Sequence, residues 1–217
     1  MKVLDVLRTE KKYLMPLAIA HRLAFQMKYV MQTDPYGKGN QGYQVRSVYF
    51  DSFEDLDFYE KAAGLECRKK IRLRTYSSGE IVKLEWKQKQ NAVQRKRSLM
   101  ISKEEALAQE FYAYLLTQAY RPRCLVQYDR FALIDPLNDT RITFDRNLCA
   151  HEGCFGLFSS HPPLYPVGGI AKITLEVKYN RFLPDYIKNI ISPYTESQVS
   201  ASKYYMARKY GLGGTAL

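Results

Sequence analysis

Charged and apolar residues alternate along several stretches of the chain. The clearest is 68–76, in which Lys70, Arg72 and Arg74 alternate with an isoleucine, a leucine and a threonine. A β-strand sends successive side chains to opposite faces of its sheet. The pattern therefore predicts a strand with one cationic face and one apolar or β-branched face.

The next stretch, 80–89, repeats this design. Lys83, Glu85 and Lys87 fall on one face, whereas a leucine and the single tryptophan fall on the other. Turn residues separate the two stretches, so they predict neighbouring antiparallel strands. Either these charged faces meet water, as the polar side of a half-buried sheet does, or they face each other across a cavity that would hold a polyanion.

The hydrophobic pattern predicts eight strands and five helices. The expected strands are 6–14, 43–50, 66–76, 80–89, 93–101, 123–134, 139–147 and 171–179. The expected helices are 16–27, 52–63, 102–120, 184–192 and 198–210. The third helix should begin with a capping box, Ser102 to Glu105. Loops are expected at 34–42 and 150–169, where glycine and proline are frequent.

Most of these strands follow one another directly, which is typical of antiparallel sheets. A sheet of that many strands tends to close on itself, because closure removes its edges. We therefore predict an α+β fold in one domain, 1–217: an eight-stranded antiparallel closed β-barrel with helices packed outside. Lysine and arginine outnumber carboxylates on the charged faces, which favours a basic lumen over an ordinary solvated surface.

Composition limits the partners. The formal net charge is +11 over 217 residues, which favours an anionic partner such as nucleic acid, an anionic membrane or a phosphorylated small molecule. The strict alternation of charged and apolar residues argues against nucleic-acid binding, because a nucleic acid needs an open basic stripe on the surface. No signal peptide and no apolar run of membrane-spanning length are evident, so a cytoplasmic protein is expected.

The four cysteines are too few and too scattered for a disulfide scaffold. Cys149, His151, Cys154 and His161 lie close together in the sequence. Their spacing matches no familiar structural zinc site, so free cysteines and loop histidines are the better interpretation.

A series of short motifs resembles one known family, in order and over almost the whole chain. They are Arg8-Thr9-Glu10-Lys11-Lys12-Tyr13, Ser47-Val48-Tyr49-Phe50-Asp51-Ser52, Lys70-Ile71-Arg72-Leu73-Arg74, Leu84-Glu85-Trp86-Lys87, Tyr128-Asp129-Arg130, Arg141-Ile142-Thr143-Phe144-Asp145, Leu175-Glu176-Val177-Lys178 and Ser202-Lys203-Tyr204. Together they resemble the VTC polyphosphate polymerase domain, a member of the triphosphate tunnel metalloenzymes (CYTH-like superfamily). Each motif is weak alone, but eight in order are specific.

The resemblance implies a transferase that moves the γ-phosphate of ATP onto a growing inorganic polyphosphate chain inside a basic tunnel, with Mn²⁺ or Mg²⁺. It implies that Arg72, Arg74, Lys87, Arg130 and Arg141 act in catalysis. Phosphate binding would fall to Lys12, Lys70, Lys96, Lys178 and Lys203. The metal would be held by Glu176, with Glu10 and Glu85 nearby. The resemblance also leaves open that a membrane-protein partner receives the polyphosphate product.

One motif departs from the wider superfamily, whose signature is Glu-x-Glu-x-Lys. Here it reads Arg8-x-Glu10-x-Lys12, so one carboxylate is lost and a cation gained. This favours binding of a phosphate chain over metal-dependent hydrolysis. Two alternatives stay open: a tunnel-family inorganic or nucleoside triphosphatase, and a non-catalytic polyphosphate-binding module. No Gly-x-x-x-x-Gly-Lys-Ser/Thr loop is present, so a P-loop mechanism is excluded.

Overall fold

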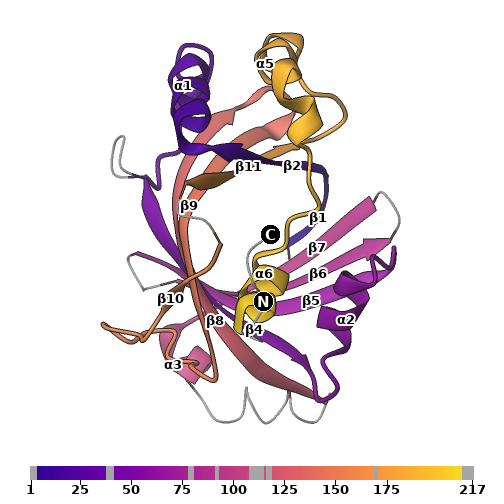
Figure 1. The fold of residues 1–217 in the computed structure, drawn as a ribbon, viewed down its shortest axis with the longest axis vertical. Helices are drawn as coiled ribbons and strands as arrows, with labels where there is room; N and C mark the ends of the chain where they lie inside the picture. The colour runs from indigo at the N-terminus through magenta and orange to yellow at the C-terminus, as the bar shows by residue number, and fades with distance from the viewer. Residues whose placement is uncertain are drawn as a thin grey trace.

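The computed structural model describes residues 4–37, 42–77, 81–90, 93–107, 115, 119–168 and 171–211. Its main feature is a long, strongly curled antiparallel sheet (Figure 1). Its strands are β1 (Leu4–Leu7), β2 (Thr9–Pro16), β3 (Gln32–Thr33), β4 (Tyr43–Ser52), β5 (Arg68–Tyr76), β6 (Val82–Gln90), β7 (Val93–Ile101), β8 (Tyr120–Asp135), β9 (Thr140–Glu152), β10 (Tyr165–Pro166) and β11 (Lys172–Tyr179). All eight expected strands are confirmed, with the first divided into β1 and β2.

The sheet is a curled half-barrel, and the expectation of a fully closed barrel is corrected. The strand order is β1-β7-β6-β5-β4-β8-β9-β11-β2, with β3 paired to β8 and β10 to β9. The two end strands, β1 and β2, are successive parts of one N-terminal segment interrupted at Arg8. β1 pairs with β7 at one edge of the curl and β2 pairs with β11 at the other, so different parts of this segment pair with the two edges and neither β1 nor β2 is laddered to both.

The described helices are α1 (Leu17–Met27), α2 (Leu56–Ala62), α3 (Lys103–Leu107), α5 (Asp185–Ile191) and α6 (Lys203–Gly211). Two 3₁₀ turns, η2 (Leu137–Asp139) and η3 (Ser192–Ser197), complete the elements. The capping box is confirmed: Ser102 Oγ accepts from the Glu105 amide at 3.1 Å, and the Ser102 amide donates to Glu105 Oε2 at 2.7 Å. Most of the predicted helix beyond Leu107 lies outside the described residues. The last helix begins at Lys203, five residues later than expected.

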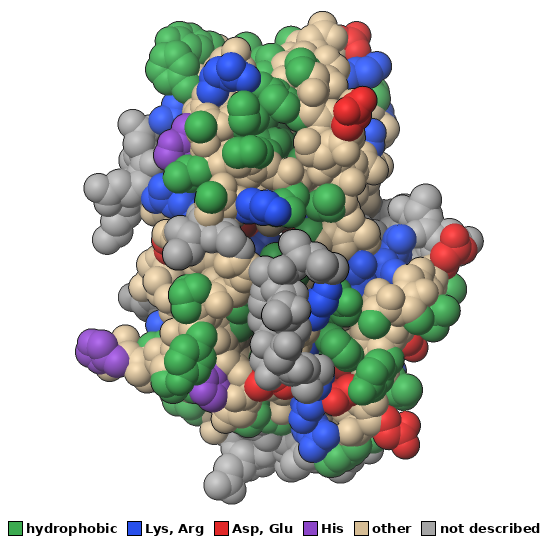
Figure 2. Space-filling model, in the orientation of Figure 1, with side chains coloured by type: hydrophobic (Ala, Val, Ile, Leu, Met, Phe, Trp, Pro, Cys, Tyr) green, Lys and Arg blue, Asp and Glu red, His purple; other side chains and the backbone are tan. Residues whose placement is uncertain are grey.

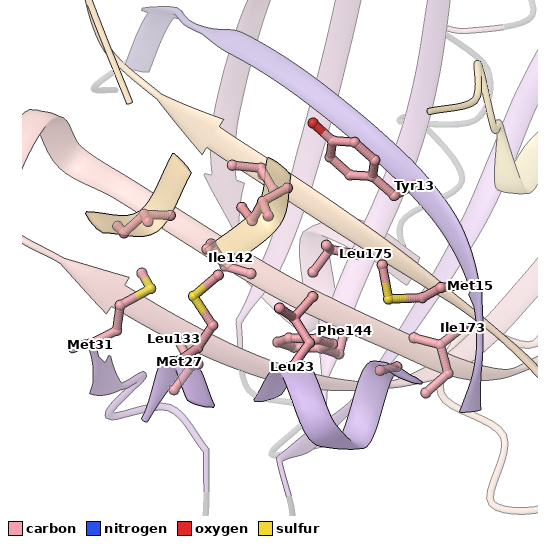
Figure 3. Packing of buried hydrophobic residues seen from close by; sticks show 14 of the residues in the cluster. Tyr13, Met15, Leu23, Met27, Met31, Leu133, Ile142, Phe144, Ile173 and Leu175 are labelled. Atoms are coloured by element: carbon pink, nitrogen blue, oxygen red, sulfur yellow. The ribbon is translucent and has the colours of Figure 1, made fainter. Parts of the chain in front are cut away.

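Helices cover the outer, apolar side of the sheet at one end of the molecule. α1 and α5 lie there over β2, β9 and β11 (Figure 1). One buried apolar cluster contains Leu23 and Met27 of α1, Met15 of β2 and Leu175 of β11 (Figure 3). Burial of this apolar stripe holds α1 on the sheet. Among the described residues, no helix is long and apolar enough to cross a membrane.

Gly42, just before β4, lies at a close contact between chain segments. Its φ is +77°, and a Cβ there would clash with the backbone carbonyl of Arg130. We expect Gly42→Ala to lower the free energy of unfolding by at least about 2 kcal/mol, since it adds a steric clash to the cost of a left-handed backbone. Urea denaturation monitored by circular dichroism measures this.

Gly64 provides a matched control. Its φ is +75°, but a Cβ there would meet no atom within 4 Å. Gly64→Ala should therefore show only the backbone cost, about 1 kcal/mol. Equal destabilisation by the two substitutions would contradict the clash at Gly42.

Candidate functional site

A cavity of about 680 Å³ lies within the curl of the sheet. Lysine and arginine greatly outnumber carboxylates in its lining, and we call it the basic cavity. Twelve of the thirteen predicted site residues line it: Glu10, Lys12, Lys70, Arg72, Arg74, Lys87, Lys96, Arg130, Arg141, Glu176, Lys178 and Lys203. Lysine and arginine side chains lie, with hydrophobic side chains between them, at the middle of the face shown in Figure 2. The structure thus brings the predicted residues together; their roles stay predictions.

Strand register explains this convergence. Arg72 lies opposite Glu85 of β6, and Lys70 lies opposite Lys87. On the far side of the sheet, Glu176 of β11 lies opposite Lys12 of β2. Because the sheet is curled, the charged faces of both halves point toward the same interior space.

Glu85 forms an ion-pair cluster at one wall of the basic cavity. Arg72 Nε donates to Glu85 Oε2 at 2.6 Å, Arg74 Nη1 lies 3.5 Å from the same oxygen, and Lys96 pairs with Oε1. Burial alone would raise the pKa of Glu85, but Arg72, Arg74 and Lys96 hold it well below its usual value. Glu85 is therefore ionised, and it aligns the two arginines of β5.

Glu10 and Glu176 form a second cluster on the opposite wall. Lys12 Nζ lies 3.2 Å from Glu10 Oε1 and 3.5 Å from Glu176 Oε1. Lys87 pairs with Glu10 at 2.8 Å, and Lys178 pairs with Glu176 at 2.5 Å. Burial and Glu176 would raise the pKa of Glu10, but the three lysines lower it to about 2. Both carboxylates are therefore ionised at neutral pH.

Arg130 and Arg141 occupy different settings. Arg130 makes a bidentate ion pair with Asp145 of β9, with both contacts at 2.7 Å, and Lys203 pairs with the same carboxylate at 2.5 Å. Burial would raise the pKa of Asp145, but Arg130 and Lys203 lower it to about 2. Arg141 instead pairs with Asp34 and donates to the Tyr43 hydroxyl at 2.7 Å. Arg130 is thus fixed in place by a carboxylate that the site prediction did not include.

The predicted metal carboxylates are divided between the two clusters. In the described part of the chain, no three His, Cys, Asp or Glu side chains group closely enough to hold a metal ion. Glu10 and Glu176 are ionised oxygen donors on one wall and fit a hard divalent cation if phosphate oxygens supply further ligands. Glu85 fits poorly, because Arg72, Arg74 and Lys96 already engage its oxygens. A metal would therefore be held by Glu10 and Glu176 together with substrate.

The segment before α6 contributes groups that the sequence prediction missed. Lys12 Nζ donates to the Ala201 carbonyl at 2.9 Å, and Lys61 Nζ donates to Ser200 Oγ at 3.1 Å. Lys70 Nζ donates to Ser202 Oγ at 2.6 Å. These residues, which line the basic cavity, bring part of the chain against its lysines. No periodicity marks this segment, because it is neither strand nor helix.

Asp57 of α2 also lines the basic cavity and was not predicted. It is buried, and the Tyr120 hydroxyl donates to its Oδ1 at 3.1 Å. Burial and the neighbouring Asp51 raise the pKa of Asp57 from 3.8 to about 7. At pH values between 3.8 and about 7, Asp57 keeps a proton in the folded protein that it has released in the unfolded chain. The contribution of Asp57 to the free energy of unfolding therefore falls as pH rises.

Asp57→Asn should remove that dependence, since asparagine resembles the protonated acid. We expect the variant to unfold at the same denaturant concentration as the wild type near pH 4. At pH 8 it should be more stable by about 1 kcal/mol or more. A constant difference across this range would show that Asp57 titrates normally. Urea titrations at several pH values provide the measurement.

Proteins of known structure share this fold. A candidate adenylate cyclase from Bacillus halodurans superposes with a TM-score of 0.57 at 15% identity, covering 91% of this chain and 95% of that one. A candidate adenylate cyclase from Vibrio parahaemolyticus gives 0.55 at 12% identity, covering 93% and 96%. A Hippeastrum candidate adenylyl cyclase, described as having dominant triphosphatase activity, gives 0.53 at 13% identity, covering 97% and 96%. The chain therefore shares its fold with these proteins.

Within that fold class the chain belongs to the VTC domain family. The family model matches residues 7–210, nearly the full length. This confirms the resemblance seen in the ordered motifs. No curated protein matches the chain.

Proposed function

We propose that this protein is a metal-dependent polyphosphate polymerase, which transfers the γ-phosphate of ATP to a growing polyphosphate chain in the basic cavity. The excess of cations over carboxylates in that cavity is the observation that carries the proposal. A polyphosphate carries about one negative charge per phosphate and needs many cationic partners. Membership of the VTC domain family supports the same function.

The side chains suit phosphoryl transfer, which depends on positioning and charge neutralisation more than on covalent chemistry by the protein. Arg72 and Arg130 are each held by a carboxylate, at 2.6 and 2.7 Å, so their guanidinium groups are aligned before substrate binds. Arginine offers paired N–H donors to phosphate oxygens, whereas Lys87 and Lys96 supply point charges. Mn²⁺ or Mg²⁺ beside Glu10 and Glu176 would neutralise phosphate oxygens further.

In the proposed reaction, a terminal oxygen of the polyphosphate attacks the γ-phosphorus of ATP, and the bond to the β,γ-bridging oxygen breaks to release ADP. Arg72, Arg74 and Lys87 would hold the transferred phosphoryl group. Arg130 would orient a phosphate next to it. Lys12, Lys70, Lys178 and Lys203 would bind the remaining phosphates. Delivery of the product to a membrane-protein partner stays a prediction of the family resemblance.

The test is to incubate the purified protein with ATP and Mn²⁺ and to separate polyphosphate on a gel. Long polymer is expected, and Arg72→Ala should abolish it. Arg22→Ala, an exposed arginine of α1, is the control and should keep full activity. Intact ATP after prolonged incubation would refute the polymerase, and tight polyphosphate binding without turnover would instead identify a binding module.

A triphosphatase is the second candidate, because a fold neighbour from Hippeastrum is described as having dominant triphosphatase activity. At 13% identity that neighbour shows the fold alone. The two functions give different products in the same assay: a polymerase yields ADP and polymer, whereas a triphosphatase releases inorganic phosphate and no polymer.

A further inference from the structure

A serine and a lysine form a close pair in the wall of the basic cavity. Lys70 Nζ lies 2.6 Å from Ser202 Oγ, and both residues line the cavity. Ser202 is only 6% exposed. A serine hydroxyl beside a lysine amine is a known arrangement for an activated nucleophile, provided that the amine can accept the proton.

The surroundings of Lys70 make its amine a suitable proton acceptor. Burial lowers its pKa well below the usual value, and so do the nearby cations Lys12, Arg72 and Lys87. Asp57 acts in the opposite direction, but more weakly. The Tyr49 and Tyr204 rings lie against the amine, each with its centroid 5.9 Å away, and no carboxylate pairs with it in the described structure.

Ser202 also has a structural role that must be weighed. It precedes α6, and its Oγ accepts from the Tyr205 amide at 3.4 Å, so it caps the helix. That contact is long, whereas the contact with Lys70 is short. The cap and the lysine pair are compatible, because a hydroxyl oxygen has two acceptor lone pairs and one proton.

We propose that Ser202 is a phosphoryl acceptor: its Oγ attacks the terminal phosphorus of a nucleoside triphosphate in the basic cavity, and its proton passes to Lys70. The new bond is Ser202 Oγ–P, and the bond that breaks joins the terminal phosphorus to the β,γ-bridging oxygen. The nucleoside diphosphate leaves. This inference rests on the proposed function only for the presence of a nucleoside triphosphate in the cavity.

The product of this step would be stable where it forms. A phosphoserine at position 202 would stand at the N-terminus of α6, where partial positive charge favours anions. It would also lie beside Lys70 and near Lys12, which contacts the adjacent Ala201 carbonyl at 2.9 Å. These lysines already hold the segment before α6, so phosphorylation would strengthen contacts that exist without it.

The test is mass spectrometry of the full chain after incubation with ATP and Mn²⁺ and an acid quench, with peptide mapping of any phosphorylated site. We expect one added phosphoryl group, on Ser202. Ser202→Ala should abolish it and Ser202→Thr, which keeps a hydroxyl and a capping oxygen, should restore it in part. Ser192→Ala is the control, because Ser192 is exposed and does not line the basic cavity; this variant should keep the adduct.

Lys70→Arg tests the proton acceptor. Arginine keeps the positive charge but cannot be deprotonated in proteins. The rate of adduct formation should fall by on the order of a hundredfold. An unchanged rate would overturn the role of Lys70, and an adduct that maps elsewhere would overturn that of Ser202.

The same reaction mixture distinguishes this inference from the proposed function. Polymer without an adduct on Ser202 would leave the polymerase standing and overturn the inference. An adduct without polymer would support the inference and refute the polymerase. Unreacted ATP with no adduct would overturn both.

Discussion

Replacing Glu176 with glutamine is expected to lower the proposed polyphosphate synthesis by a factor on the order of 100 to 1,000, because a divalent ion held beside this carboxylate would supply several kcal/mol of charge stabilisation. Glu176 is buried and ionised, and it lies within 3.5 Å of Lys12 and 2.5 Å of Lys178. Glutamine keeps the size of the side chain but removes the charge, so the ligand set that fits a metal is reduced to Glu10.

Binding and turnover should respond in opposite directions to this substitution. Loss of one negative charge leaves Lys12 and Lys178 less neutralised, so polyphosphate should bind at least as tightly as before. Turnover, measured as ADP release at saturating ATP, should nevertheless fall. Raising the Mn²⁺ concentration should recover part of the activity.

Glu152→Gln is the matched control for Glu176→Gln. Glu152 is also ion-paired, to Arg208 at 2.9 Å, but it does not line the basic cavity. Its replacement should leave turnover unchanged. Equal losses of turnover in the two variants would show that Glu176→Gln acts through general destabilisation. Full activity of Glu176→Gln would show that Glu176 does not hold the metal.

The second large effect is expected at Glu85, and it concerns stability. Glu85 is 1% exposed and pairs with Arg72, Arg74 and Lys96. Glu85→Gln would leave these cations without their carboxylate partner in the interior. Removing one partner of a buried ion pair typically costs about 3–5 kcal/mol. Chemical denaturation should show a loss of that size, whereas Glu66→Gln, at an exposed glutamate, should show almost none.

Ligand binding offers a separate check on this interpretation. An inorganic triphosphate bound in the basic cavity would replace the missing negative charge of Glu85. It should therefore raise the unfolding temperature of Glu85→Gln more than that of the wild type. Equal shifts in the two proteins would indicate that the three cations are not exposed to the ligand.

The strands and their charged faces could be predicted from the sequence because alternation is a local property. Lys70, Arg72 and Arg74 share a face whatever their neighbours are, and the apolar residues between them are buried as expected. The Ser102–Glu105 box likewise fixes a helix start through local hydrogen bonds. All thirteen predicted site residues came from such local patterns or from the family resemblance.

What the sequence could not provide was the pairing between distant segments. Glu85 and Glu10 both carry carboxylates at alternating positions, yet one meets two arginines and the other meets lysines across the cavity. Asp57 and Ser202 reach the cavity from a short helix and an irregular segment, where no period marks an inward face. The late start of α6 has the same origin, because the segment before it is held by Lys12, Lys61 and Lys70.

The division of the N-terminal strand also has a consequence for how the protein is made. β1 and β2 come first among the described strands, but the ladder of β2 is with β11, the last of them. During synthesis β2 must therefore wait for nearly the whole chain to emerge, and contacts of such high sequence separation form slowly. Until β11 arrives, Glu176 and Lys178 are absent and Lys12 has no carboxylate across from it. We therefore expect the basic cavity to be completed late in folding, so that nascent chains should not capture polyphosphate prematurely.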